Sequence, residues 1–272
     1  MAAVFFTPMA FHGFDGHDSK SGPYQMVPVK EARLVGIRTP HQDCFVRSLH
    51  DQIVSVACQE RISLWGDEHY QFPLVGHSVG RTQVVVESRR GHALAHLTVS
   101  VKERRVRTYS ILLLQDRQHS TVRSIPDAQR MMGAVGKLYL QQANVQLAPK
   151  FAPRTLTVSD DLGIPLDVTK ERRDRILHFL PTDELLLIAN NVRVIFSWRL
   201  AGRQLGVTNE PTALVFLADG SSVYVLAHEV GHALGLSHND VPDSLMSAEE
   251  TENPTSPQLF WHEIDKVNPS GT

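Results

Sequence analysis

The segment AHEVGHALGLSH, residues 227–238, constrains the fold more than any other part of the sequence. It places three histidines and one glutamate among alanine, valine, leucine and glycine, residue types that normally build a buried helix. Burying imidazoles and a carboxylate without a ligand is unfavourable, because these polar groups lose their hydration. The segment therefore predicts a helix whose apolar side chains pack on a core and whose polar side chains bind a metal ion.

Helical periodicity brings His228 and His232 together, because residues four apart lie on the same face of a helix. Glu229 is rotated by about 100° from His228 around the helix, so we expect it to reach a water molecule at the open position of the ion. Gly235 can adopt a positive φ that ends the helix and turns the chain back, which delivers His238 to the same ion. Three imidazoles and one open position are typical of a catalytic zinc site.

The stretch HEVGHALGLSH fits the pattern H-E-x-x-H-x-x-G-x-x-H at every fixed position and so resembles the metzincin metalloproteases. Met246, in SLMS, is similar to the methionine of the tight turn below the metal in that family. Within the metzincins, HALGLSHNDVPDSLM is most similar to the matrixins. The resemblance implies that His228, His232 and His238 are zinc ligands. It also implies that Glu229 is the general base and acid and that Met246 forms the floor of the site.

The sequence departs from parts of this family at two positions. Ala248 stands where astacin- and serralysin-like members carry an additional tyrosine ligand. Cys44, in HQDCFVR, lacks the frame of the cysteine-containing latency peptide of matrixins. Control by a cysteine switch is therefore not expected.

The resemblance also implies where a substrate binds. In metzincins the strand just before the active-site helix forms an edge of the sheet, and the corresponding strand here contains Ala213, Leu214, Val215 and Phe216. An extended peptide can add to such an edge through main-chain hydrogen bonds, which predicts a polypeptide substrate. The alternative is that these residues form a central hydrophobic strand.

These features predict a zinc-dependent endopeptidase that hydrolyses peptide bonds with metal-activated water and Glu229 as general base. Two alternatives stay open at this point. The same chemistry serves a zinc amidase that acts on cell-wall peptides. The chain could instead be a binding module in which the metzincin-like half is kept as a catalytically idle scaffold, although the retained Glu229 speaks against this.

The N-terminal part of the chain predicts an all-β domain. From residue 26 to 103, short β-like runs such as TQVVVES and ALAHLTVSV alternate apolar with polar residues and are separated by glycine and proline. The run YQFPLVGHSVGRTQVVVESRRGHALAHLTVSVK resembles the bacterial immunoglobulin-like modules. We therefore expect an immunoglobulin-like β-sandwich with a flexible N-terminal tail over residues 1–104, available to bind a protein partner.

Beyond the charged hinge KERRVR, residues 102–107, the periodicity changes. SIPDAQRMMGAVGKLYLQQA predicts an amphipathic helix capped by Ser124. TKERRDRILHFL, SSVYVLAHEVGHALG and SPQLFWHEIDKV predict further helices, and NVQLAP, DELLLIAN, VRVIFSW and TALVFLA predict strands. This order favours an α/β metzincin-like domain with a twisted mixed sheet over residues 105–272.

Composition excludes other classes of function. With 27 basic and 29 acidic residues in 272, the net charge is −2, and no nucleic-acid partner is expected. No apolar run is long enough to span a membrane, and the N-terminus has no basic region typical of a signal peptide. We expect a chain that is cytoplasmic as synthesised, and leave open its export as a secreted effector by a signal-independent system. Cys44 and Cys58 are expected to be free and buried, with one disulfide as the alternative.

Overall fold

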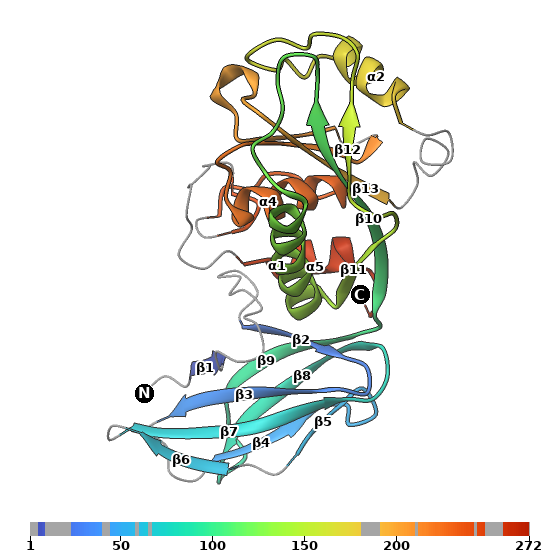
Figure 1. The fold of residues 1–272 in the computed structure, drawn as a ribbon. Coiled ribbons are helices and arrows are strands. Elements are labelled where there is room, and N and C mark those ends of the chain that lie inside the picture. The colour runs from blue at the N-terminus through green and yellow to red at the C-terminus, as the bar shows by residue number, and fades with distance from the viewer. Residues whose placement is uncertain are drawn as a thin grey trace. The chain divides into compact units, whose positions relative to one another are not determined.

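The computed structural model is mostly β, with several helices and three sheets among the residues that it describes (Figure 1). These residues are 5–8, 23–39, 44–57, 60–64, 67–180, 191–209, 212–241, 244–247 and 258–271. The chain divides into two compact units. Met1–Arg105, Tyr139–Val145 and Gln258–Thr272 form the first unit, and Val106–Leu138 and Gln146–Pro257 form the second. The predicted domains 1–104 and 105–272 stay a prediction, because a compact unit need not fold independently.

The first unit contains two sheets (Figure 1). The strands of the five-stranded sheet are β1 (Phe5–Pro8), β3 (Ala32–Thr39), β7 (Asp67–Gly76) and β5 (Val54–Val56), in this order, with β6 (Glu60–Leu64) also paired to β7. The strands of the four-stranded sheet are β2 (Tyr24–Pro28), β9 (Ala93–Lys102), β8 (Gly80–Ser88) and β4 (Cys44–Ser48). Neighbouring strands are antiparallel, except that β2 runs parallel to β9.

One hydrophobic core lies between these two sheets. Alternate residues of β3 and β7, such as Ile37 and Phe72, pack with alternate residues of β8 and β9, such as Val84 and Val99. The predicted alternation of apolar and polar residues is confirmed here, because only one side of each strand faces this core. The interpretation of these two sheets as an immunoglobulin-like module stays a prediction. Cys44 is buried in the core, and Cys58 lies outside the described residues.

The C-terminal segment of the first unit packs on β9 through polar contacts. It contains α5 (Trp261–Val267) and ends in a turn after Asn268. Lys102, at the end of β9, is fully buried, and its ammonium donates to the carbonyl oxygens of Asn268 and Ser270, both at 2.7 Å. The same ammonium lies 2.8 Å from the carboxylate of Asp265 on α5. A polar residue of β9 therefore anchors the last helix of the chain.

The second unit is built around a mixed sheet, as the sequence predicts. Its strands are β11 (Val145–Pro149), β10 (Arg105–Gln115), β13 (Asn191–Ser197), β15 (Leu214–Ala218) and β14 (Gly206–Asn209), in this order, with β12 (Arg154–Thr157) also paired to β10. β10, β12, β13 and β15 are parallel, whereas β14 is antiparallel to β15. Every residue of β13 and β15 is buried, which is typical of central strands covered on both faces.

The predicted position of the sheet edge is wrong. Leu214, Val215 and Phe216 lie on β15, which pairs with β13 on one side and β14 on the other. Ala213 precedes β15, in a turn with a φ of 48°. Because both sides of β15 already form ladders, it cannot accept another strand. Among the described strands, the antiparallel β14 is the one that ends this side of the sheet.

Four helices and a short 3-10 turn complete the described fold: α1 (Ile125–Ala143), α2 (Lys170–His178), η1 (Ala201–Arg203), α4 (Val223–Ala233) and α5. The predicted cap of α1 is confirmed, since Ser124 Oγ accepts the amide of Asp127 and donates to its carboxylate. α4 begins after Ser222, whose hydroxyl accepts the amide of Val225, and packs on β14 and β15. No described helix has the length and apolar character needed to cross a membrane. The predicted strand DELLLIAN lies outside the described residues.

Candidate metal centre

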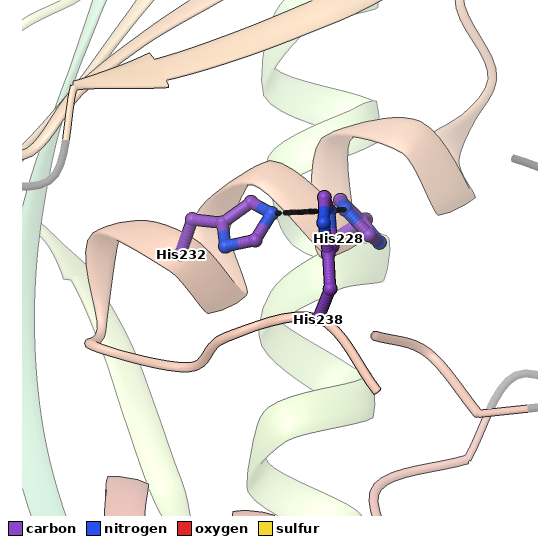
Figure 2. Close-up of side chains that lie close together, drawn as sticks. All are labelled: His228, His232 and His238. Atoms are coloured by element: carbon purple, nitrogen blue, oxygen red, sulfur yellow. Dashed lines mark hydrogen bonds between the residues drawn. The ribbon is translucent and has the colours of Figure 1, made fainter. Parts of the chain in front are cut away.

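Three imidazole rings converge at the C-terminal end of α4 (Figure 2). The Nε2 atom of His232 lies 3.0 Å from that of His228 and 3.0 Å from that of His238, and the third Nε2 pair is 3.1 Å apart. His228 and His232 are one helical turn apart, as the sequence predicts, and His238 reaches them from the loop after the helix. The structure thus brings the three predicted ligands together.

Carbonyl oxygens fix the orientation of two of these rings. His228 Nδ1 lies 2.8 Å from the carbonyl oxygen of Leu245, and His232 Nδ1 lies 2.9 Å from that of Leu236. A carbonyl only accepts, so each Nδ1 carries the hydrogen, and in a neutral ring the Nε2 lone pair is left for another partner. Two lone pairs that face each other at 3.0 Å repel unless a cation lies between them. The three rings therefore fit a metal ion, and imidazole suits zinc.

His228 is neutral near pH 7, because its pKa is lowered to about 4. Partial burial is the largest cause of this shift, the hydrogen bond to Leu245 opposes it, and the neighbouring rings of His232 and His238 add to it. Only the neutral imidazole has a lone pair to offer a metal. The ring is thus held in the ligand form by its surroundings.

The end of α4 places His238. Gly235 has a φ of 95°, its amide donates to His232 O at 2.9 Å, and the amide of Leu236 donates to Gly231 O at 2.9 Å. This pair of hydrogen bonds is the Schellman motif, which ends a helix with one left-handed residue and reverses the chain. The predicted turn at Gly235 is confirmed.

Met246 lies in a turn that is bonded to the same loop. Its side chain is fully buried, and its carbonyl oxygen accepts the amide of Asn239 at 2.9 Å. Ser244 Oγ accepts the Met246 amide at 3.0 Å and the Asn239 side-chain amide at 2.9 Å. Because the neighbouring Leu245 carbonyl orients His228, this turn supports the histidine cluster directly.

Glu229 points to β14, a contact that the sequence analysis missed. Its side chain is 4% exposed, and the hydroxyl of Thr208 donates to its carboxylate. The Thr208 hydroxyl also lies 2.9 Å from the carbonyl oxygen of Glu229. Gly206, two residues earlier on β14, faces the same side chain. Neither residue belongs to a motif, so no signal in the sequence identifies them.

A second group of possible ligands is occupied by internal hydrogen bonds. Asp116, His119 and Asp161 lie close enough to share an ion. However, the Asp116 carboxylate already accepts the amides of Gln118, His119 and Leu162, and lies 3.1 Å from the His119 ring. A carboxylate offers about four lone-pair positions. Asp116 therefore holds loops together rather than binding a metal.

A family model supports the interpretation of the histidine cluster. Residues 192–267 match the model of the matrixin peptidases. This segment is matrixin-like. The matrixin-like segment begins in β13 and includes all three histidines, Glu229 and Met246. This match supports a metzincin-like, zinc-dependent peptidase. A matrixin-like domain also fits the observed mixed sheet and helices. No curated protein sequence matches the chain.

Three solved structures are similar to parts of the chain. Domains 4 and 5 of the S-layer protein SbsC align at 16% identity, with a TM-score of 0.24, over 30% of this chain and 48% of that one. A zinc-dependent peptidase from Methanocorpusculum labreanum aligns at 13% identity, with a TM-score of 0.39, over 60% of this chain and 100% of that one. A chaperone–substrate complex aligns at 15% identity, with a TM-score of 0.37, over 92% of this chain and 44% of that one. The chain thus spans about half the length of the S-layer structure.

Proposed function

We propose that the chain is a zinc-dependent endopeptidase in which His228, His232 and His238 hold one zinc ion. The observation that carries this proposal is the convergence of the three Nε2 atoms at 3.0–3.1 Å. Glu229 follows His228 directly on α4 and is buried. The matrixin-like segment, which contains all four residues, supports the same function.

Each group has a separate role in the proposed reaction. A bound zinc ion would supply a Lewis acid for a water molecule and for the carbonyl of the bond to be cleaved. Glu229 takes a proton from the attacking water and passes it to the leaving amine. The carbonyl oxygens of Leu245 and Leu236 keep His228 and His232 in the tautomer that binds a metal.

The proposed substrate is an extended polypeptide that pairs with β14. β14 ends the sheet among the described strands and also carries the residues that contact Glu229. A peptide added to this edge would form main-chain hydrogen bonds regardless of its sequence. The bond to be cleaved would then lie beside the general base. This replaces the earlier expectation that β15 binds the substrate.

Metal analysis combined with a cleavage-site profile tests the proposal. The purified chain should contain about one zinc ion per molecule, and it should cleave peptide bonds in a denatured protein mixture. Glu229→Ala should keep the zinc and lose turnover by about 100-fold or more, since that is the usual contribution of a general base. The matched control is Glu171→Ala, which removes an exposed carboxylate of α2 and should leave both properties unchanged.

Two results would contradict the proposal. The first is purified protein without stoichiometric zinc. The second is a Glu229→Ala variant that is as active as the natural chain. Parallel digestion of purified cell wall separates an endopeptidase from an amidase, because the amidase would release cell-wall peptides and leave the protein mixture intact.

A further inference from the structure

The carboxylate of Glu229 is held by two residues of β14. The Thr208 hydroxyl donates to Oε2 of Glu229. A Cβ atom placed on Gly206 would lie 2.6 Å from Glu229 Cγ, 2.8 Å from Oε1 and 3.0 Å from Cδ. Residues two apart on a strand face the same side. One face of β14 therefore offers a hydrogen-bond donor at Thr208 and, at Gly206, space that the Glu229 side chain fills.

The backbone at Gly206 does not require glycine. Gly206 is not one of the described residues with a positive φ, so residues other than glycine can also adopt its backbone conformation. Its partner in the antiparallel ladder is Leu217 of β15, and this pairing keeps the backbone from retreating. An alanine at this position would therefore displace Glu229 rather than β14. The missing side chain is explained by the space that Glu229 occupies.

Thr208 supplies the direction of the carboxylate. A hydrogen bond from a hydroxyl to an ionised carboxylate is stronger and more directional than one between neutral groups. It is made inside the protein, because Glu229 is 4% exposed and Thr208 is half-buried. Together the two residues restrict the Glu229 side chain from the side of the sheet.

We propose that Gly206 and Thr208 are positioning residues that hold Glu229 in the orientation required of a general base. This inference rests on the proposed peptidase function. A general base must stay within hydrogen-bond reach of the proton that it takes, and a displacement of about 1 Å can lower a rate about 100-fold. β14 would thus orient both the substrate and the base.

The Gly206→Ala variant tests whether Glu229 needs the space left by the missing side chain at position 206. Alanine is compatible with the backbone here and disfavours the unfolded chain relative to glycine. We expect zinc content and KM to stay near those of the natural chain, while kcat falls by about 100-fold. A crystal structure of the variant should show Glu229 in another rotamer. An unchanged kcat, or an unmoved Glu229, would overturn the role of Gly206.

Thr208→Val and Thr208→Ser test the hydroxyl. Valine keeps the shape of threonine without the donor, and we expect kcat to fall by about tenfold or more with KM and zinc content unchanged. Serine keeps the donor and should restore most of kcat. Equal kcat values for the two variants would overturn the role of the hydroxyl, and so would loss of zinc in Thr208→Val.

A double-mutant cycle separates this inference from the proposed function. The unfolding free energy is measured for Thr208→Val, Glu229→Gln and the double variant. If the contact is real, Thr208→Val should destabilise the Glu229→Gln protein less than the natural one. Coupling without any hydrolysis by the natural chain would refute the peptidase and keep the contact. Hydrolysis that depends on Glu229, without coupling, would refute the positioning role alone.

Discussion

At the scale of single residues, Asp116 shows how a carboxylate can organise loops. It is 4% exposed and accepts hydrogen bonds from three backbone amides, those of Gln118, His119 and Leu162. Burial raises the pKa of Asp116, but these hydrogen bonds and the one from His119 outweigh it and keep the pKa below its usual value. The ionised form is therefore the one that stabilises the fold.

Asp116→Asn should destabilise the protein by about 1–3 kcal/mol near pH 7, because the amide nitrogen would face backbone donors. The difference from the natural chain should persist down to about pH 4 and shrink below it, as the natural Asp116 becomes protonated. Urea unfolding at several pH values measures this. Asp174→Asn, an exposed change on α2, is the control and should shift the unfolding free energy little. A difference that stays constant to low pH would contradict the prediction.

The residues of the site differ in how far the sequence reveals them. His228, His232 and His238 lie within one short segment, so helical periodicity and one glycine are enough to predict that they meet. Gly206 and Thr208 contact Glu229 only because β14 pairs with β15 and both pack on α4. A glycine and a threonine in a short strand form no pattern of their own. Contacts of this kind depend on the tertiary fold.

At the scale of elements, the end of α4 determines whether the third histidine reaches the other two. Gly235 adopts a φ of 95°, and a Cβ atom there would meet no atom within 4 Å. A substitution at this position therefore acts through backbone conformation alone. Since His238 follows three residues later, the strain would be relieved most easily by moving that ligand.

Gly235→Ala should introduce about 1–2 kcal/mol of backbone strain. If this strain is released by shifting His238, the Kd for zinc should rise roughly tenfold. Zinc competition with a chelator measures the Kd. Gly133→Ala, on the exposed face of α1, is the matched control; it should stabilise the helix by about 0.5–1 kcal/mol and leave the Kd unchanged. Equal zinc affinity in both variants would contradict the prediction.

The wrong sheet edge has a physical explanation at the same scale. Apolar character identified residues 214–218 as a buried strand, but it does not reveal how many neighbours a strand has. β14 is only four residues long, and GVTN carries a weak strand signal. The sequence therefore did not reveal the order of the strands in the sheet. The helices α1, α2 and α4 and most strands were predicted from local patterns.

At the scale of the whole molecule, the chain leaves the first unit after residue 105, contributes residues 139–145 to it, and returns to it again at residue 258. The polar face of β9 contacts the C-terminal segment that returns to this unit. Leu97, Val99 and Val101 face the core, and the alternating Ser100 and Lys102 would be expected in water. Both are fully buried instead, because the C-terminal segment covers them. The sequence shows the alternation but not the segment that covers its polar side.

Asp265→Asn tests how much this packing contributes to the stability of the protein. Burial lowers the pKa of Lys102, and Asp265 opposes that shift, so loss of the carboxylate leaves a buried cation without its charged partner. We expect destabilisation of about 3–5 kcal/mol, measured by urea unfolding. Glu31→Gln breaks an exposed pair with Arg104 and should cost less than about 1 kcal/mol. Equal effects of the two changes would contradict the prediction.

The loop from α4 to Met246 has a consequence for how the proposed peptidase would be quantified. All three imidazoles and the carbonyls that orient two of them come from residues 228–245, whereas the groups that orient Glu229 come from β14. Under the proposed function, a molecule with a misplaced β14 would still bind zinc but would not hydrolyse its substrate. Elemental analysis would then overcount competent molecules, and titration with a mechanism-based inhibitor would be the sounder measure of their concentration.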